Sequence, residues 1–134
     1  LIHAAIKSYS TVHKSPKTNA FIHEQALYKL AKCYETSGLN GERTAQNGDL
    51  AKALEHYRDL FFGYQEKIKQ AQPTNSYYFC RTGYDLARLQ MMFTTPHLKS
   101  AINTYEILGQ SGLPGTQEAR LLAQQLREVL KNEK

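Results

Sequence analysis

LAKALEHYRDL, residues 50–60, is one of three stretches in this chain with the same apolar spacing. Residues 2–12 read IHAAIKSYSTV, and residues 98–108 read LKSAINTYEIL. Each begins with an aliphatic residue, followed by alanine three positions on, a second aliphatic residue at four, tyrosine at seven and a third aliphatic residue at ten. These offsets place all five side chains on one stripe of an α-helix. The pattern therefore predicts three amphipathic helices, each of which buries this stripe.

The alanine stands four residues before the tyrosine in every copy, at Ala5, Ala53 and Ala101. A small side chain lets a neighbouring helix approach closely, and the ring one turn further on fills the space beside it. Successive alanines are 48 residues apart in both intervals, since 53 − 5 and 101 − 53 are equal. A helix of this kind cannot bury its stripe alone, so the repetition predicts stacked helices.

Proline and glycine residues divide the chain into six predicted helices. These helices are expected over residues 1–13, 20–36, 50–71, 76–93, 96–110 and 116–131. Asp49 is expected to cap the third helix, Asn75 or Ser76 the fourth, and Pro96 to occupy the first position of the fifth. No segment has a convincing strand pattern, so the predicted fold class is all-α.

The helices between the three stretches share a second pattern, a leucine followed by an alanine in mid-helix. The pairs are Leu30-Ala31, Leu86-Ala87 and Leu122-Ala123. Two helix types thus alternate along the chain, and this alternation resembles the tetratricopeptide repeat family. In that family one helix of each pair carries leucine before glycine or alanine, and the other carries alanine with an aromatic residue four positions on. The resemblance covers essentially the whole chain and is closest to divergent bacterial members, and Ala101 precedes Ala123 by 22 residues, as in a regular repeat of about 34 residues.

The resemblance implies a right-handed superhelical α-solenoid of antiparallel helix pairs, with about six helices in a single domain over residues 1–134. The 48-residue spacing is then the sum of unequal insertions and not a repeat length. Gly83 and Gln90 depart from the family pattern, in which a large residue and a tyrosine are usual. The chain begins with leucine and its first helix lacks a partner, so we expect a piece of a longer protein. Part of the first stripe is then left uncovered, at Ile2, Ile6 and Tyr9.

The net charge of +5 is compatible with acidic peptides, nucleic acid or anionic surfaces as partners. No apolar run reaches the ~18–20 residues that a membrane span needs. Cys33 and Cys80 are expected at different levels of the helix stack, too far apart for a disulfide, as free and mostly buried thiols. The compartment stays open between the cytoplasm and, for a bacterial protein, the cell envelope.

Residue patterns typical of catalysis, metal binding or cofactor binding do not occur in the sequence. A zinc-protease helix would need a second histidine where Leu27 follows His23 and Glu24. Glu55 and Asp59 lie at i and i+4, and the simplest interpretation is a solvated helix face. The sequence therefore predicts no enzyme, no cofactor and no metal site.

The tetratricopeptide resemblance places the Leu-Ala helices on a concave surface that holds partners. Carried over position by position, the groove is expected to be lined by Tyr28, Lys32, Arg81, Tyr84, Arg88, Arg120, Gln124 and Arg127. Tyr28 with Lys32, and Tyr84 with Arg88, repeat a tyrosine and a base at i and i+4. Tyrosine supplies apolar area and a base pairs with a carboxylate, which favours an acidic peptide. Family members that bind the tails of chaperones clamp a carboxylate with lysine and asparagine. This chain does not have that pair at the corresponding positions, so the resemblance does not imply that it binds chaperone tails.

We therefore expect a non-catalytic protein–protein interaction scaffold that binds a peptide or a partner protein. Two alternatives stay open. The first is a nucleic-acid-binding helical repeat, which the basic charge and the nine tyrosines permit. Acidic residues interleaved from residue 24 onward argue against it. The second is a structural or oligomerising segment of a larger envelope protein or enzyme, whose oligomeric state the sequence does not determine.

Overall fold

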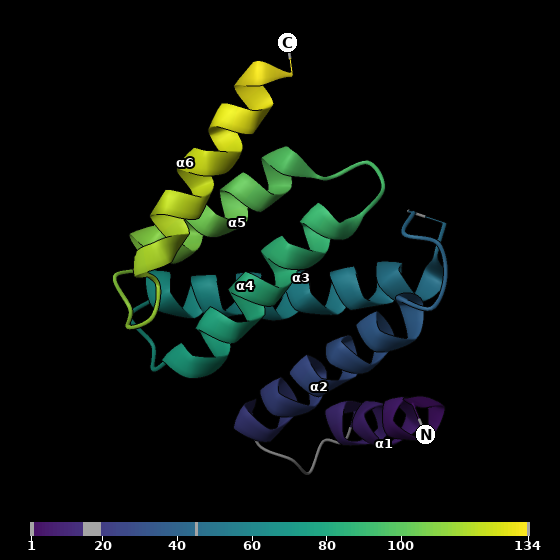
Figure 1. Cartoon of the computed structure of the whole chain (residues 1–134). Helices are drawn as coiled ribbons and strands as arrows, with labels where there is room; N and C mark the ends of the chain where they lie inside the picture. The colour runs from purple at the N-terminus through teal and green to yellow at the C-terminus, as the bar shows by residue number, and fades with distance from the viewer. Residues whose placement is uncertain (1, 15–19, 45, 134) are drawn as a thin grey trace. The chain divides into compact units, whose positions relative to one another are not determined.

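The computed structural model describes residues 2–14, 20–44 and 46–133. These residues form six α-helices and no strand, which confirms the all-α prediction (Figure 1). The helices are α1 (Ile2–Lys14), α2 (Ala20–Gly38), α3 (Gly48–Lys69), α4 (Ser76–Met92), α5 (Leu98–Gln110) and α6 (Gln117–Asn132). All six lie where the sequence places them, and the ends differ by at most two residues.

The chain forms two compact units, and the boundary falls inside α3. Unit 1 comprises residues 1–60 and unit 2 residues 61–134. In unit 1, α1 packs against α2. In unit 2, α5 packs against both α4 and α6. Each unit has its own buried side chains.

The core of unit 1 combines the repeated stripe on α3 with the Leu-Ala pair of α2. Ala31, Ala53 and Tyr57 are fully buried. The Tyr57 hydroxyl donates a hydrogen bond of 2.7 Å to Oε1 of the buried Glu35, and the Tyr28 and Tyr57 ring centroids are 6.3 Å apart. The small alanines thus leave room for large rings, as the spacing predicts.

The core of unit 2 is built around stacked aromatic rings. Phe61 and Phe79 lie parallel, with centroids 5.2 Å apart, and Tyr64 meets Phe79 edge-on at 6.2 Å. All three side chains are at most 1% exposed. The third copy of the stripe, on α5, contributes Ala101 and Leu108, which are fully buried.

The two departures from the family pattern have local packing reasons in unit 2. A Cβ at Gly83 would lie 2.6 Å from Cδ2 of Leu108 and 2.7 Å from Cε1 of Phe61, so neighbouring side chains already fill that space. Gln90 is buried and its Oε1 accepts a hydrogen bond of 3.0 Å from the Thr104 hydroxyl. The amide oxygen of Gln90 can be buried because it has this hydrogen-bond partner. The same bond links α4 to α5.

The residues that begin α3 and α5 differ from those expected from the sequence. Asn47, and not Asp49, caps α3, because its Oδ1 accepts from the Leu50 backbone N–H at 3.2 Å. The Asp49 carboxylate instead accepts a hydrogen bond from the Ser37 hydroxyl at 2.7 Å. The fifth helix begins at Leu98, two residues after Pro96. The cap expected for the fourth helix is confirmed, since the Asn75 side chain accepts a hydrogen bond from the Tyr78 backbone N–H.

Candidate functional site

One face of α4 in unit 2 carries aromatic, basic and acidic side chains at helical spacing. Tyr77, Arg81 and Asp85 follow each other at intervals of four, and Cys80 and Tyr84 lie beside them. The Asn75 cap begins the helix just before this face. The sequence thus presents these side chains together because of the 3.6-residue period of the helix.

The loop between α5 and α6 is attached to this face by two side-chain hydrogen bonds. The Cys80 thiol donates to the Pro114 carbonyl at 3.1 Å, and the Tyr84 hydroxyl donates to the Gly115 carbonyl at 2.9 Å. Gly112 and Gly115 have φ values of +70° and +87°, which L side chains rarely adopt. The two glycines allow the sharp path that brings the loop to α4.

Helix and loop together enclose an open hollow of about 560 Å³, which we call the α4 hollow. It is lined by Ser76, Tyr77, Cys80, Arg81, Tyr84, Asp85, Pro114 and Gly115. Tyr77 is 61% exposed, and the Arg81 guanidinium lies 5.8 Å from the centre of its ring. A cation above a tyrosine ring is held by a favourable electrostatic contact. The volume is in the usual range for small-ligand and side-chain pockets.

The Tyr84 hydroxyl and the Cys80 thiol, which both line the α4 hollow, are neutral. Burial raises the pKa of the Tyr84 hydroxyl, and the nearby Cys80, Glu118 and Tyr105 raise it further, against a backbone hydrogen bond from Ala119. Burial also raises the pKa of the Cys80 thiol. Both groups therefore stay protonated and act as donors, and the charges of the hollow come from Arg81 and Asp85.

Thiol alkylation should report this environment. In a Cys33→Ser variant, Cys80 is expected to react with iodoacetamide more slowly at about pH 8 than the same thiol in urea, because a raised pKa leaves less thiolate. Its rate should continue to rise above about pH 9, where an ordinary thiol is already mostly ionised. Mass spectrometry of quenched samples gives the rates. Equal rates in the folded and unfolded protein would contradict the expected shift.

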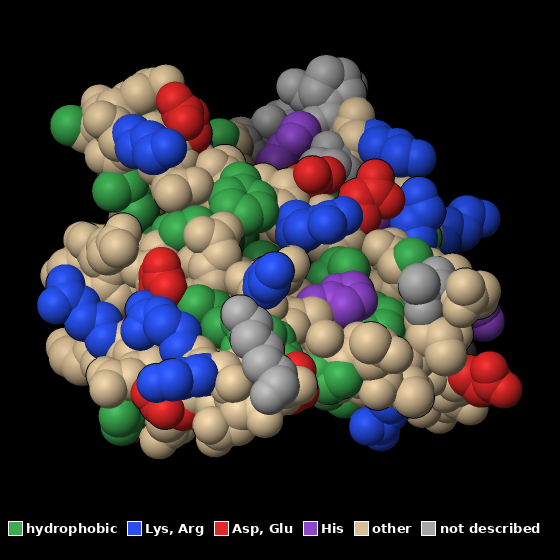
Figure 2. Space-filling view, turned by 90° about the horizontal axis from the view of Figure 1, so that it is seen from above, with side chains coloured by type: hydrophobic (Ala, Val, Ile, Leu, Met, Phe, Trp, Pro, Cys, Tyr) green, Lys and Arg blue, Asp and Glu red, His purple; other side chains and the backbone are tan. Residues whose placement is uncertain are grey.

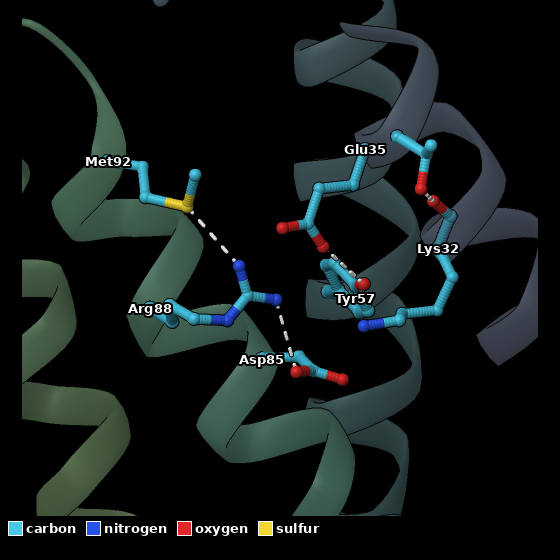
Figure 3. A network of polar contacts seen from close by, with 7 residues as sticks. Lys32, Glu35, Tyr57, Asp85, Arg88 and Met92 are labelled. Atoms are coloured by element: carbon cyan, nitrogen blue, oxygen red, sulfur yellow. Dashed lines mark hydrogen bonds and ion pairs between the residues drawn. The ribbon is translucent and has the colours of Figure 1, made fainter. Parts of the chain in front are cut away.

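The structure gathers part of the predicted groove around the α4 hollow, namely Arg81 and Tyr84. Arg88 lies one turn beyond Tyr84 and contacts its own helix. Its Nη2 is 3.1 Å from Oδ1 of Asp85, and its Nη1 is 3.2 Å from Sδ of Met92 (Figure 3). Arg88 is therefore engaged along α4 and does not line this hollow.

The predicted residues on α6 gather at a different place, between α5 and α6. Arg120, Gln124 and Arg127 line a second hollow of about 330 Å³ with Glu106 and Gln110 of α5. Arg127 bonds to Oε1 of Glu106 through both Nε, at 3.1 Å, and Nη2, at 2.8 Å. The Nε of Arg120 donates to the Gly109 carbonyl. Both arginines are thus bound to α5.

In unit 1 the two predicted residues have different surroundings. Tyr28 is only 6% exposed and packs on Tyr57, so it belongs to the core. Lys32 is half-buried and lines a hollow between α1 and α2. Tyr28 and Lys32 therefore do not form one exposed pair, although their i, i+4 spacing suggests it.

Several residues that line the α4 hollow are not among those expected from the sequence. Tyr77 and Asp85 flank Arg81 at four residues on either side, so helical spacing was a usable signal for them. Pro114 and Gly115 come from a loop far along the chain. No local sequence pattern predicts the contact of Pro114 and Gly115 with α4, because this contact depends on how α5 packs against α4.

No group of three or more histidine, cysteine, aspartate or glutamate side chains that could hold a metal ion occurs among residues 2–14, 20–44 and 46–133. Within the same described part of the chain, no helix is both long and apolar enough to cross a bilayer. The chain was compared with protein-family models, with curated proteins and with solved structures, and none of the three gave a significant match.

Proposed function

We propose that this chain is a non-catalytic protein-interaction module of tetratricopeptide-like helix pairs, and that unit 2 binds an acidic peptide segment of a partner protein in the α4 hollow. The observation that carries the proposal is the lining of this hollow, in which two tyrosines and a proline lie beside the guanidinium of Arg81. The alternating helix types support the solenoid part of the proposal, together with the packing of α5 between α4 and α6.

The walls of the hollow favour an apolar side chain. Two of its donors, the Cys80 thiol and the Tyr84 hydroxyl, are already used by the carbonyls of the α5–α6 loop. A group that accepts a hydrogen bond from either of these two donors would have to displace its present bond, whereas an apolar or aromatic side chain gains contact area without doing so. The exposed ring of Tyr77 adds a further wall at the edge.

Arg81 favours a carboxylate next to that side chain. A guanidinium presents five donors in a planar fork, which matches a carboxylate with two parallel bonds. The Arg81 guanidinium carbon lies 5.8 Å from the centre of the Tyr77 ring, and this cation–π contact favours the observed orientation of the Arg81 side chain. The peptide we propose therefore carries an apolar residue beside an aspartate or glutamate.

A nucleic-acid partner is the competing interpretation, and the charge distribution does not favour it. Figure 2 shows lysine and arginine side chains interspersed with aspartate and glutamate on one face of the molecule. Binding to phosphates usually requires clustered basic side chains along a stripe or patch. Retention on heparin at physiological salt would support the competing interpretation.

Charge reversal at Arg81 is expected to weaken binding of an acidic peptide by about tenfold or more, because a charge-assisted pair becomes a repulsion. Fluorescence anisotropy with a labelled pool of peptides, each with one aromatic residue beside aspartate or glutamate, measures the affinity of Arg81→Glu against the parent chain.

Arg58→Glu is the matched control, since Arg58 is an exposed arginine of α3 in unit 1 and its reversal changes the net charge equally. Unchanged binding by Arg81→Glu would refute the assignment of the α4 hollow. An equal loss in Arg58→Glu would also count against it, because it would indicate attraction to the net charge alone.

A further inference from the structure

The hollow between α5 and α6 is lined by polar side chains, and the proposed peptide site does not account for it. This α5–α6 hollow, of about 330 Å³, is bounded by Glu106, Gln110, Arg120, Ala123, Gln124 and Arg127. Apart from the alanine, every lining residue carries a hydrogen-bonding side chain. None of these residues lines the α4 hollow, so a ligand here is independent of the peptide site. A polar lining of this kind favours a polar or charged ligand over an apolar side chain.

Gly109 of α5 lets the Arg120 side chain lie across that helix. The Nε of Arg120 donates a hydrogen bond of 3.1 Å to the Gly109 carbonyl. A Cβ at Gly109 would lie 2.5 Å from Cγ of Arg120 and 3.3 Å from its backbone nitrogen, so a larger residue would push the arginine away. The guanidinium is thus held at the hollow before any ligand binds, which lowers the entropic cost of binding.

Both arginines of the hollow keep hydrogen-bond donors that the protein does not use. A guanidinium has five N–H donors. Arg120 uses one of them on an α5 carbonyl, and Arg127 directs two, from Nε and Nη2, to Oε1 of Glu106. Within the described part of the chain, neither arginine makes another hydrogen bond. The amides of Gln110 and Gln124 also line the hollow and supply further N–H groups.

The helix faces that meet at this hollow are basic overall. Lys99 lies on the same stripe of α5 as Glu106, seven residues before it, and Lys131 follows Arg127 by four residues on α6. Both lysines are exposed. Glu128 borders the α6 face, three residues before Lys131. With the two arginines of the hollow, there are four basic side chains and two carboxylates, which gives this surface a net charge of +2.

We infer that the α5–α6 hollow binds a phosphoryl group, carried by a free phosphate monoester or by a phosphorylated side chain. A phosphoryl group carries a charge of about −1.5 to −2 and three acceptor oxygens. This charge offsets that of the surface, and the oxygens use the donors that the arginines leave unpaired. Two oxygens accept from the Nη atoms of Arg120, whose planar fork suits such a pair, and the third accepts from Arg127.

Carboxylates and nucleic acids fit this site less well. A carboxylate has two acceptor oxygens and a single charge, so one guanidinium satisfies it and the remaining positive charge stays unbalanced. A nucleic-acid strand presents successive phosphates, and Glu106 and Glu128 would repel the neighbours of a phosphate bound here. Among the described residues, no aromatic ring lines the hollow for a base to stack on. These properties favour a single phosphoryl group.

Glu106 occupies Arg127 in the free protein and competes with the ligand. The Arg127 and Glu106 side chains are 50% and 35% exposed, and an ion pair as exposed as this one contributes little to stability. A phosphoryl oxygen can therefore take the place of Oε1 on Arg127 while the Glu106 carboxylate turns to water. Removal of this carboxylate should strengthen binding, an effect that a purely structural ion pair would not produce.

Nuclear magnetic resonance titrations of the whole chain test the inference. The probes are inorganic phosphate, phenyl phosphate, benzoate and a short peptide with one phosphoserine, at about pH 7.5 and equal ionic strength. The phosphate probes are expected to shift the Arg120 Nε–H and Gln124 amide resonances in a saturable way, with dissociation constants on the order of 1 mM or lower. Benzoate should bind about fivefold more weakly than phenyl phosphate. Tighter binding of the phosphopeptide than of phenyl phosphate assigns the site to a phosphorylated side chain, and the reverse order assigns it to a free monoester.

Three variants separate the anchored arginine from the overall charge. Arg120→Met is expected to weaken binding of phenyl phosphate by about tenfold, and Gly109→Ala by about threefold although it changes no charge. Glu106→Gln should strengthen binding by about threefold. Should Gly109→Ala perturb folding, Arg120→Lys keeps the charge but loses the planar fork, and it should also weaken binding by about threefold.

Arg58→Met and Asp59→Asn are the matched controls, since both residues are exposed on α3 in unit 1 and the changes in net charge are the same. Neither should alter the affinity for phenyl phosphate by more than about 1.5-fold.

Several results would overturn the inference. They are the absence of saturable shifts with every phosphate probe, benzoate that binds as tightly as phenyl phosphate, and a loss in Arg58→Met equal to that in Arg120→Met. Unchanged affinity in both Gly109→Ala and Arg120→Lys would refute the role of the anchored guanidinium. Tighter binding of an RNA oligonucleotide than of any phosphate monoester, at the same resonances, would assign the surface to nucleic acid instead.

Discussion

Replacing Phe79 by alanine is expected to lower the free energy of unfolding of unit 2 by about 3–5 kcal/mol. The Phe79 ring is fully buried, stacks on Phe61 and meets the edge of Tyr64. Its removal loses the transfer free energy of the ring and leaves a cavity between α3 and α4 that rigid neighbours fill only in part. Urea unfolding followed by far-UV circular dichroism measures the change, and hydrogen exchange of α4 and α5 amides locates it in unit 2.

Phe62→Ala is the matched control because Phe62 is the same residue type but 39% exposed. Its ring contacts Phe61 from the edge, so a loss below about 1 kcal/mol is expected. Equal losses for the two variants would mean that the stacked rings are not the centre of the unit 2 core. The result would then contradict the packing described for α3 and α4.

Gly83→Ala is expected to destabilise the chain by about 1–3 kcal/mol, although alanine is the better helix former by about 1 kcal/mol. The new methyl group would lie 2.6 Å from a methyl carbon of Leu108 and 2.7 Å from the Phe61 ring. Both neighbours are fully buried and have little room to retreat. Gly83→Val should cost more, and thermal unfolding with urea titration gives both values.

Gly63→Ala provides the opposite expectation in the same unit. A Cβ at Gly63 would meet nothing within 4 Å, and the residue is exposed in α3. Alanine there should stabilise the helix by about 0.5–1 kcal/mol, because only the backbone preference changes. If Gly83→Ala also stabilises the protein, the close approach of α4 to Phe61 and Leu108 is wrong.

The helices of this chain follow from the sequence because their signals are local. The 3.6-residue spacing of apolar residues marks six helices, and prolines and glycines mark their ends. The cap of α3 shows the limit of such local signals. Asp49 and Asn47 are both good capping residues, and Asn47 takes the role while Asp49 bonds to Ser37 of α2, a contact between segments.

The candidate site was only partly predictable for the same reason. The tetratricopeptide resemblance predicts Arg81 and Tyr84 as groove residues, and both line the α4 hollow. The same resemblance predicts Tyr28 as a groove residue, but Tyr28 lies in the core of unit 1, because α3 places the Tyr57 ring beside it. The contact that completes the hollow, between α4 and Gly115, joins residues 31 positions apart.

The sequence by itself determined the fold class, the number of helices and the stripe of each helix that packs inward, because helix periodicity is read from neighbouring residues. Tertiary structure alone decided how far each stripe is buried and which exposed side chains share a hollow. The three stripes show the difference most clearly. Their spacing is the same, yet Ala53 and Ala101 are fully buried while Ala5 is half-open, because burial depends on the helices packed around the stripe and not on the stripe itself.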